Sequence, residues 1–481
     1  MRYRVVIRVL SLIIIFTSIA MLLGLPFSFY YGDGDHIALL LSSGIGIAIS
    51  IPGLFFLPKR HEDIRSKEGF AIVTLGWISF ATIGALPFVL SGAVPHYTDA
   101  FFETMSGFTT TGASILTDIE AVPHGILFWR SLTHWLGGMG IIVLTIAILP
   151  FLGVGGMQMF KAESPGPTVD KLSPRIASTA KILWGVYVFF TLFETALLML
   201  AGMSLFDALC HSFGTLATGG FSTKNASIAA YSSATVDYII IVFMIIAGTN
   251  FSLHYKLFTG KFSDFFKNPE FRFFISLIAL ATFIIFLEVL LFQYHEVGKS
   301  FQYSSFQVVS IMTTTGYCTA DYEKWSITAQ IILFMLMFIG GSAGSTGGGI
   351  KVIRLLLLVK FAYNELIRLL HPNAIVAVKI SGQVIDRKVL INVAGFFIIY
   401  VMITAVSVLI VSSFGLDFAT SMGAVAATIN NIGPGLGGVG PTDNYAHLPS
   451  ALKWFLSFLM MLGRLEIYTV IILLSPTFWK R

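Results

Sequence analysis

Long apolar runs, separated by short polar or glycine-containing stretches, dominate the pattern of residues along the chain. A helix needs about 20 predominantly apolar residues to cross the hydrocarbon core of a bilayer, and many runs reach that length. The pattern predicts ten membrane spans, with both termini on one side of the membrane. These spans lie near 9–30, 37–57, 70–94, 125–152, 180–203, 236–258, 273–293, 327–350, 389–414 and 451–475.

One pattern recurs four times after the first two spans: a span, a short semi-apolar stretch, a turn with glycine, and a second span. A helix of about 12 residues is about 18 Å long and cannot cross a core of about 30 Å, so each stretch should enter the membrane and turn back. Asp99, Asp207, Ser304 and Asp417 are placed to cap these short helices at their N-termini.

The expected fold is therefore an all-α integral membrane protein. It has four pseudo-symmetric repeats of membrane helix, pore helix and membrane helix around a central pore, preceded by an N-terminal transmembrane helix pair. The predicted boundaries are 1–68 for the helix pair and 69–174, 175–268, 269–384 and 385–481 for repeats 1 to 4.

The four turns are the candidate ion-binding residues. Non-helical backbone at membrane depth is tolerated where it is buried or lines a water-filled cavity, so the turns should converge on a pore. Glycine allows successive carbonyls to point inward, and rings of carbonyls can replace the hydration shell of a monovalent cation such as potassium. No Asp or Glu lies within the turns, which argues against a divalent-selective ring of carboxylates. The alternative is that the turns are packing loops. Their residues are Thr110, Thr111 and Gly112; Ala217, Thr218 and Gly219; Thr314, Thr315 and Gly316; and Asn431, Ile432 and Gly433.

A glycine-rich string interrupts the eighth predicted span. Each glycine lowers helix propensity by about 1 kcal/mol, so the span should break there. The string lacks the Gly-Lys-Ser/Thr ending of a phosphate-binding loop, which excludes nucleotide binding at this site. Two interpretations remain: close helix packing, or a movable obstruction below the turns. The residues of this candidate gate are Gly340, Gly341, Ser342, Ala343, Gly344, Ser345, Thr346, Gly347, Gly348 and Gly349.

Arg464 lies about 20 Å below the outer end of the last predicted span at about 1.5 Å per residue. An arginine at this depth needs a partner or water. We expect the carbonyls of the glycine-rich string to be that partner, and Glu466 is a second candidate. A buried pair of Arg464 with Glu466, without a role in permeation, is the structural alternative.

Composition excludes most other function classes. Of 481 residues, 56% are hydrophobic and 11% are charged, which is far from a soluble enzyme. No nucleophile motif is present, the histidines lack metal-ligand spacing, and Cys210 and Cys318 cannot form a disulfide framework. Glu194 and Glu288 lie within predicted spans. Two interpretations remain for them: ion or proton sites, or partners in interhelical hydrogen bonds.

Positive charge is distributed unevenly. Most of the 30 Lys and Arg residues lie in the N-terminus, the C-terminus and alternate loops, which the positive-inside rule assigns to the cytoplasm. Both termini are therefore expected in the cytoplasm. The opposite side is assigned Arg130, Lys224, Lys299, Lys324 and Lys453.

Four single-glycine turns, the string from Gly340 to Lys351, and the motif Leu462-Gly-Arg-Leu-Glu466 resemble the Trk/Ktr/HKT superfamily of potassium transporters. The resemblance covers the whole chain and is strongest to the bacterial TrkH-type uptake subunits, which also carry an extra N-terminal helix pair. It implies a potassium-permeable filter, since glycine in all four turns accompanies potassium permeation in the superfamily. The fourth turn lacks a threonine before its glycine, which implies weaker ion discrimination than four identical turns would give.

The resemblance also implies partners and location. Members form homodimers in the bacterial inner membrane on a cytoplasmic ring of TrkA-type subunits, nucleotide-binding domains of the RCK or KTN kind. NAD(H) or ATP/ADP is expected on that ring, K⁺ is the transported ion, and no cofactor is expected on this chain. The implied gate is the glycine-rich string, held by Arg464. Membrane lipid is an expected contact and nucleic acid is not. A proton- or sodium-coupled potassium symporter remains the alternative.

Overall fold

The structure is a computed structural model that describes residues 1–55, 66–140, 176–373, 376–380 and 383–480. Helices make up almost all of its regular structure, in agreement with the predicted all-α fold. One short hairpin, β1 Lys379–Ile380 and β2 Gln383–Val384, is the exception in the described part of the chain.

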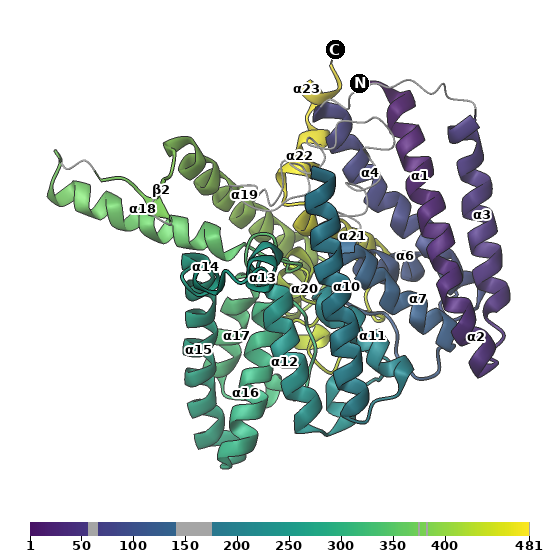
Figure 1. Ribbon diagram of the computed structural model, residues 1–481, viewed down its shortest axis with the longest axis horizontal. Coiled ribbons are helices and arrows are strands. Elements are labelled where there is room, and N and C mark those ends of the chain that lie inside the picture. Colours follow the sequence, from purple (N-terminus) through teal and green to yellow (C-terminus); the bar gives the residue numbers. More distant parts are fainter. Residues whose placement is uncertain (56–65, 141–175, 374–375, 381–382, 481) are drawn as a thin grey trace.

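The N-terminal helices form a tight pair on one side of the molecule. The first, α1 Tyr3–Met21, continues through η1 Leu22–Gly24 into α2 Leu25–Tyr31, and α3 His36–Phe55 packs against α1. A Cβ at Gly46 would overlap the hydroxyl of Ser18, so glycine permits the close approach that helices in lipid use. Figure 1 shows α1 and α3 side by side, with both chain termini at the same end of the molecule.

Four long helices correspond to the first span of each predicted repeat. Each is long and apolar enough to cross a membrane. They are α4 Ser66–Gly84 with α5 Leu86–Leu90, α10 Ile176–Leu200, α15 Pro269–Val289 with η5 Leu290–Tyr294, and α19 Arg387–Ser412.

Four shorter helices follow them, as predicted: α6 Tyr97–Phe108, α11 Leu205–Leu216, α16 Val297–Met312 and α20 Phe418–Ile429. Of the four predicted caps, Asp417 is one, since its carboxylate accepts the backbone N–H of Thr420. Hydrogen bonds from Thr420 keep the pKa of the Asp417 carboxyl below its usual value, because they favour the charged form.

The other three predicted caps are wrong. Asp99 and Asp207 lie in the first turns of α6 and α11, whose N-cap residues are His96 and Ser204. Ser304 lies inside α16, which begins at Val297 and is therefore longer than its sequence pattern indicated.

The second helix of each predicted repeat is broken. A run of α12 Ala234–Gly248 and α13 Phe251–Phe258 bends by 103°. The glycine-rich string separates α17 Ile327–Met337 from α18 Val352–Leu370, as the sequence predicted. The remaining two are α7 His124–Trp135, which runs into the distorted turn η2 Leu136–Gly140, and α21 Ser450–Arg464, which is separated from α22 Tyr468–Leu474.

Among the described residues, six helices pass as continuous membrane spans and the bent pair α12 and α13 makes a seventh. The predicted span at 327–350 is interrupted at its glycine-rich string, as expected, whereas the interruption of the predicted span at 451–475 after Arg464 was not expected. Much of the predicted span at 125–152 lies outside the described residues. The domain boundaries stay predictions.

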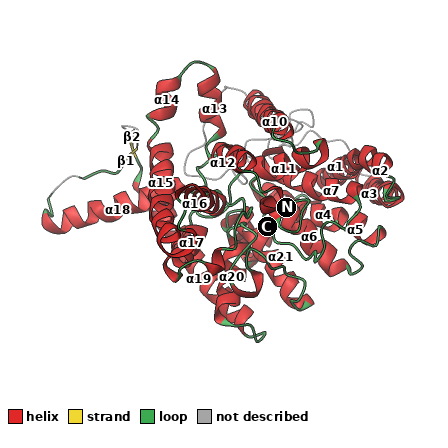
Figure 2. Ribbon diagram, turned by 90° about the horizontal axis from the view of Figure 1, so that it is seen from below, coloured by secondary structure: helices red, strands yellow, loops and turns green. Residues whose placement is uncertain are grey.

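Contacts between the helices run in a cycle. Each second helix packs against the short helix of the next unit: α7 against α11, α12 against α16, α17 against α20, and α21 against α6. Figure 2 shows these helices placed around a common centre. The cycle brings the four turns that follow the short helices together. Helix α18 leaves the body of the protein and projects sideways (Figure 1).

Candidate functional site

The four turns share one backbone conformation. Each begins with a non-glycine residue at positive φ: Thr110 at 52°, Thr218 at 54°, Thr314 at 60° and Asn431 at 56°. Two residues later each has a glycine at positive φ: Gly112 at 81°, Gly220 at 80°, Gly316 at 81° and Gly433 at 97°. Threonine is strained in this region, so the surrounding structure must impose the conformation.

The second turn is one residue later than the sequence predicted. Its pattern is Thr218, Gly219 and Gly220, so Gly220, rather than Gly219, is equivalent to Gly112. Ala217 still belongs to the end of the helix as the C-cap of α11. The same backbone bond occurs in every turn: Thr111 to Ser106 (2.8 Å), Gly219 to Gly214 (2.7 Å), Thr315 to Ser310 (2.8 Å) and Ile432 to Ala427 (2.9 Å), each from N–H to carbonyl.

The turns close into a ring. A Cβ placed on each glycine would collide with a backbone carbonyl of the next turn. These pairs are Gly112 with Gly219, Gly220 with Thr315, Gly316 with Ile432, and Gly433 with Thr111. Four equivalent carbonyls therefore face the glycines of their neighbours around one axis, and only glycine fits at each crossing.

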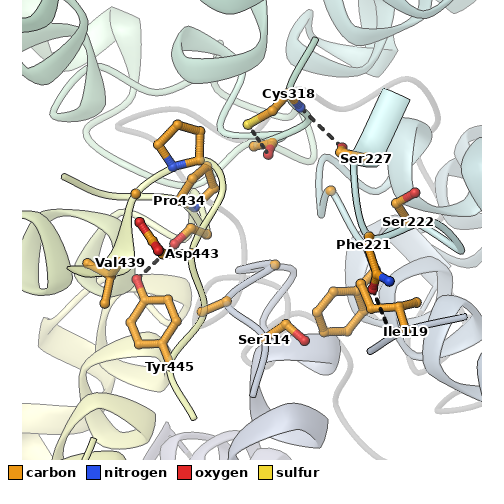
Figure 3. Close-up of a pocket in the computed structure, with 18 of the residues that line it drawn as sticks. Ser114, Ile119, Phe221, Ser222, Ser227, Cys318, Pro434, Val439, Asp443 and Tyr445 are labelled. Atoms are coloured by element: carbon orange, nitrogen blue, oxygen red, sulfur yellow. Dashed lines mark hydrogen bonds between the residues drawn. The ribbon is translucent and has the colours of Figure 1, made fainter. Parts of the chain in front are cut away.

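A cavity of about 90 Å³ opens next to this ring. All four turn glycines line it, together with Lys224, Asp443 and other residues. Figure 3 shows Ser114, Phe221, Cys318 and Pro434, one from each unit, around the opening. Within the described residues, no group of three or more His, Cys, Asp and Glu could hold a metal ion, so the backbone oxygens are the candidate ligands here.

The glycine-rich string lies directly against the ring. The N–H of Gly348 donates to the hydroxyl of Thr314 at 2.7 Å, and the Thr346 hydroxyl donates to the carbonyl of Leu216 at 2.9 Å. Further bonds tie the string to the break between α12 and α13: Ser342 N–H to the Gly248 carbonyl at 2.8 Å, and Phe251 N–H to the Gly344 carbonyl at 3.0 Å.

Arg464 holds the string to another broken helix. Its guanidinium donates to the carbonyl of Thr346 at 2.7 Å, as the sequence predicted, and to the carbonyl of Gly137 at 2.7 Å. A third bond reaches the carbonyl of Gly138 at 3.2 Å, where the backbone of η2 is non-helical. The contacts with Gly137 and Gly138 were not predicted.

Glu466 forms a salt bridge with Arg354 at the start of α18. The guanidinium of Arg354 also lies 4.1 Å from the ring centre of Phe396. The predicted alternative of an Arg464–Glu466 pair is therefore wrong. Glu466 and Ile467 have φ values of 57° and 55°, so the backbone that follows α21 is strained at two residues that are not glycine.

Three other charged residues have definite surroundings. Arg130, which the charge pattern assigned to the external side, is fully buried in a salt bridge with Glu103 at 2.6 Å. Glu288 accepts a hydrogen bond from Ser326 at 2.9 Å, as an interhelical partner should. Glu194 is fully buried and, within the described structure, neither carboxylate oxygen has a hydrogen-bond partner.

Comparison with known proteins gives a consistent result. The family model for TrkH, described as "Cation transport protein", matches residues 41–481. The chain is 43% identical to the Trk system potassium uptake protein TrkH of Salmonella typhimurium and 42% identical to that of Escherichia coli K12, with full coverage of both chains. The crystal structure of the potassium transporter TrkH from Vibrio parahaemolyticus superimposes with a TM-score of 0.90 at 39% identity and also covers both chains fully. The chain belongs to the TrkH family of cation transport proteins.

Proposed function

We propose that this chain takes up potassium across the bacterial inner membrane through a channel-like pore whose selectivity filter is the ring of four turns. Its relatives are named as potassium uptake proteins, in agreement with the prediction of a transporter rather than an enzyme. The observation that carries the filter proposal is the crossing of each turn glycine with a carbonyl of the next turn. Such a ring can replace the hydration shell of a monovalent cation.

The filter residues in this proposal are the potassium ligands. The carbonyls of Thr111, Gly219, Thr315 and Ile432 form one layer, and those of Thr110, Thr218, Thr314 and Asn431 are one residue below. The turns themselves contain no carboxylate, so selectivity comes from the spacing of dipoles rather than from a ring of charge.

The glycine-rich string is the proposed gate. It lies against Thr314 in the ring, and Arg464 ties it to Gly137 in the distorted turn of another unit. A closed gate is thereby held by bonds to backbone carbonyls, which can be exchanged for water when the string moves. The packing alternative would leave these bonds unchanged during transport.

Regulation is proposed to come from outside this chain. Basic residues of α18 and the hairpin suit a cytoplasmic ring of TrkA-type subunits that carry NAD(H) or ATP/ADP, with both termini cytoplasmic. A homodimer is supported by the projecting helix α18, where Val359, Tyr363, Leu366 and Leu370 are each more than half exposed.

Coupled symport is the second candidate, and Glu194 favours it. This carboxyl is buried without a partner in the described structure, and the hydroxyl of the nearby Thr215 donates to the His211 carbonyl at 2.9 Å instead. A proton carried by Glu194 would make uptake depend on a proton gradient. Glu288 is satisfied by Ser326 and gives no such support.

Ion flux into proteoliposomes tests the proposal. The purified chain is reconstituted with an imposed potassium or sodium gradient, and wild type is compared with Gly112→Ser. Passive flux that favours potassium, with discrimination weakened by the substitution, supports the filter. Flux that vanishes without a proton gradient and is abolished by Glu194→Gln supports coupled symport instead.

A further inference from the structure

Behind the ring, Glu103 of α6 and Arg130 of α7 form a buried network. The carboxylate of Glu103 accepts the Nε of Arg130 at 2.6 Å, the hydroxyl of Ser114 at 2.9 Å and the N–H of Ile115 at 2.8 Å. Arg130 also donates to the carbonyl of Ser222 at 2.9 Å and to the hydroxyl of Ser114 at 3.1 Å. Both side chains are almost completely buried, so bulk solvent screens their attraction little.

The network contacts equivalent positions in two turns. Ser114 follows Gly112 by two residues, and Ser222 follows Gly220 by two residues. Arg130 also lies 3.6 Å from the ring centre of Phe221, directly after Gly220. We call the residues that follow the glycine of a turn its limb. One guanidinium therefore joins the limbs of the first and second turns.

The position of Glu103 is polar in three of the four units. Seven residues before Thr110, Thr218, Thr314 and Asn431 stand Glu103, His211, Gln307 and Ala424. The His211 Nε2 and the Ser222 Oγ are 2.9 Å apart, and the Gln307 amide donates to the Ala320 carbonyl at 3.2 Å. Each side chain braces the limb of its own turn, but the first unit uses a charge.

Neutral groups join the other turns to one another. The Tyr317 hydroxyl donates to the Phe221 carbonyl at 3.2 Å, and the Tyr322 hydroxyl donates to the Gly435 carbonyl at 2.8 Å. The N–H of Tyr445 donates to the Ser114 carbonyl at 2.8 Å. Ser114 is thus held by the fourth unit through its backbone and by the charged network through its hydroxyl.

We propose that Glu103 and Arg130 are positioning residues for ion selectivity: they set the separation of the first and second turns and thereby the carbonyl spacing that distinguishes potassium from sodium. This inference rests on the proposed filter. A carbonyl ring discriminates ions by its size and by the number and field strength of its dipoles, so a displaced limb alters selectivity even while ions still pass. The three nitrogens of the planar Arg130 guanidinium each donate to a different acceptor, Glu103, Ser222 and Ser114, which fixes the limb in two directions.

The test compares potassium and sodium flux into proteoliposomes for four variants of the full chain. Glu103→Gln leaves Arg130 as an uncompensated buried charge and is at risk of misfolding. The neutral double variant Glu103→Gln with Arg130→Met avoids that charge and keeps the inference falsifiable. Glu288→Gln is the matched control, because it makes the same substitution at a partly buried hydrogen bond away from the ring. Gly112→Ser reports on the filter itself.

We expect the potassium-to-sodium flux ratio of the double variant to fall by about threefold to tenfold, with potassium flux retained and Glu288→Gln unchanged. An unchanged ratio in the folded double variant, while Gly112→Ser lowers it, would overturn this inference and leave the filter intact. If Gly112→Ser also leaves the ratio unchanged, the proposed filter fails and this inference fails with it.

Discussion

The ring of turns and the breaks in the second helices differ in how they are built. The ring repeats one backbone hydrogen bond and one pair of positive φ values in every unit. The breaks share no such pattern: a distorted turn at 136–140, a bend of 103° after Gly248, a glycine-rich string, and a strained Glu466–Ile467 step. A site that must present equal ligands around an axis needs repetition, whereas a gate needs one element that can move against the others.

The two regions also differ in their side chains. Around the ring, Arg130 and the tyrosines bond to carbonyls of the residues that follow the turn glycines, and the four carbonyls that face those glycines are left to the axis. At the breaks, Arg464 bonds directly to the glycine-rich string and to the distorted turn of another unit, so one side chain joins the proposed moving element to its neighbour. We therefore expect substitutions in the ring to reduce or alter conduction, and substitutions at the breaks to increase basal flux.

Replacing the ring glycines should have the largest effect. Gly112→Ala, Gly220→Ala, Gly316→Ala and Gly433→Ala each place a Cβ against a carbonyl of the next turn, and each position also requires positive φ. We expect potassium flux to fall by about tenfold or more in every variant, since ring geometry fails at a single crossing. Gly415→Ala, at positive φ on the surface with open space around it, is the matched control. A large loss of flux at one position and none at the other three would contradict the claim that the four turns are equivalent in the ring.

Removing the arginine of the breaks should have the next largest effect, with the opposite sign. Arg464→Ala removes the donor that joins Thr346 to Gly137, so the string loses its tie to the distorted turn and basal flux should rise by severalfold. Arg272 is an exposed arginine in helix α15, and Arg272→Ala controls for the loss of a positive charge. Unchanged or lower flux in well-folded Arg464→Ala protein would remove this residue from the gate.

The contact between the two regions should give a smaller change. Thr314→Val removes the hydroxyl that accepts the Gly348 N–H and leaves that donor buried without its partner, which costs about 1–3 kcal/mol. We expect a rise in basal flux that is smaller than that of Arg464→Ala. Thr259→Val, which removes an exposed hydroxyl bonded within its own helix, is the control. Equal flux in both threonine variants would show that the string and the ring are not coupled through this bond.

The projecting helix should have the smallest effect on transport. Leu366→Glu places a charge on the exposed apolar face of α18, far from the ring. We expect the homodimer to dissociate while flux per chain changes little, because each chain holds a complete ring of turns. Light scattering after size-exclusion chromatography in detergent measures the mass. A monomeric wild type would contradict the proposed homodimer.

Most of the architecture could be predicted from local pattern. The length of the apolar runs predicts the long helices. The low helix propensity of the glycine-rich string predicts the break in its span. The second turn was misplaced by one residue because Gly219 and Gly220 are adjacent and either can adopt positive φ. Only contacts with neighbouring turns decide between them.

Other features depend on tertiary contacts that leave no local signal. Glu466 and Ile467 adopt a strained backbone where Arg354, 112 residues away from Glu466 in sequence, provides the partner. Strain of this kind costs about 1–3 kcal/mol and persists only where surrounding structure imposes it. The charge pattern placed Arg130 on the external side but did not reveal its burial, because its partner Glu103 is 27 residues away and on another helix.

The central claim is that the four turns form one ion-binding ring with Gly220, not Gly219, in the second glycine position. A crystal of the protein soaked in rubidium or thallium salt tests it directly through anomalous scattering. We expect a peak on the axis between the carbonyls of Thr111, Gly219, Thr315 and Ile432. No peak on that axis, with bound ions placed elsewhere in the protein, would contradict it.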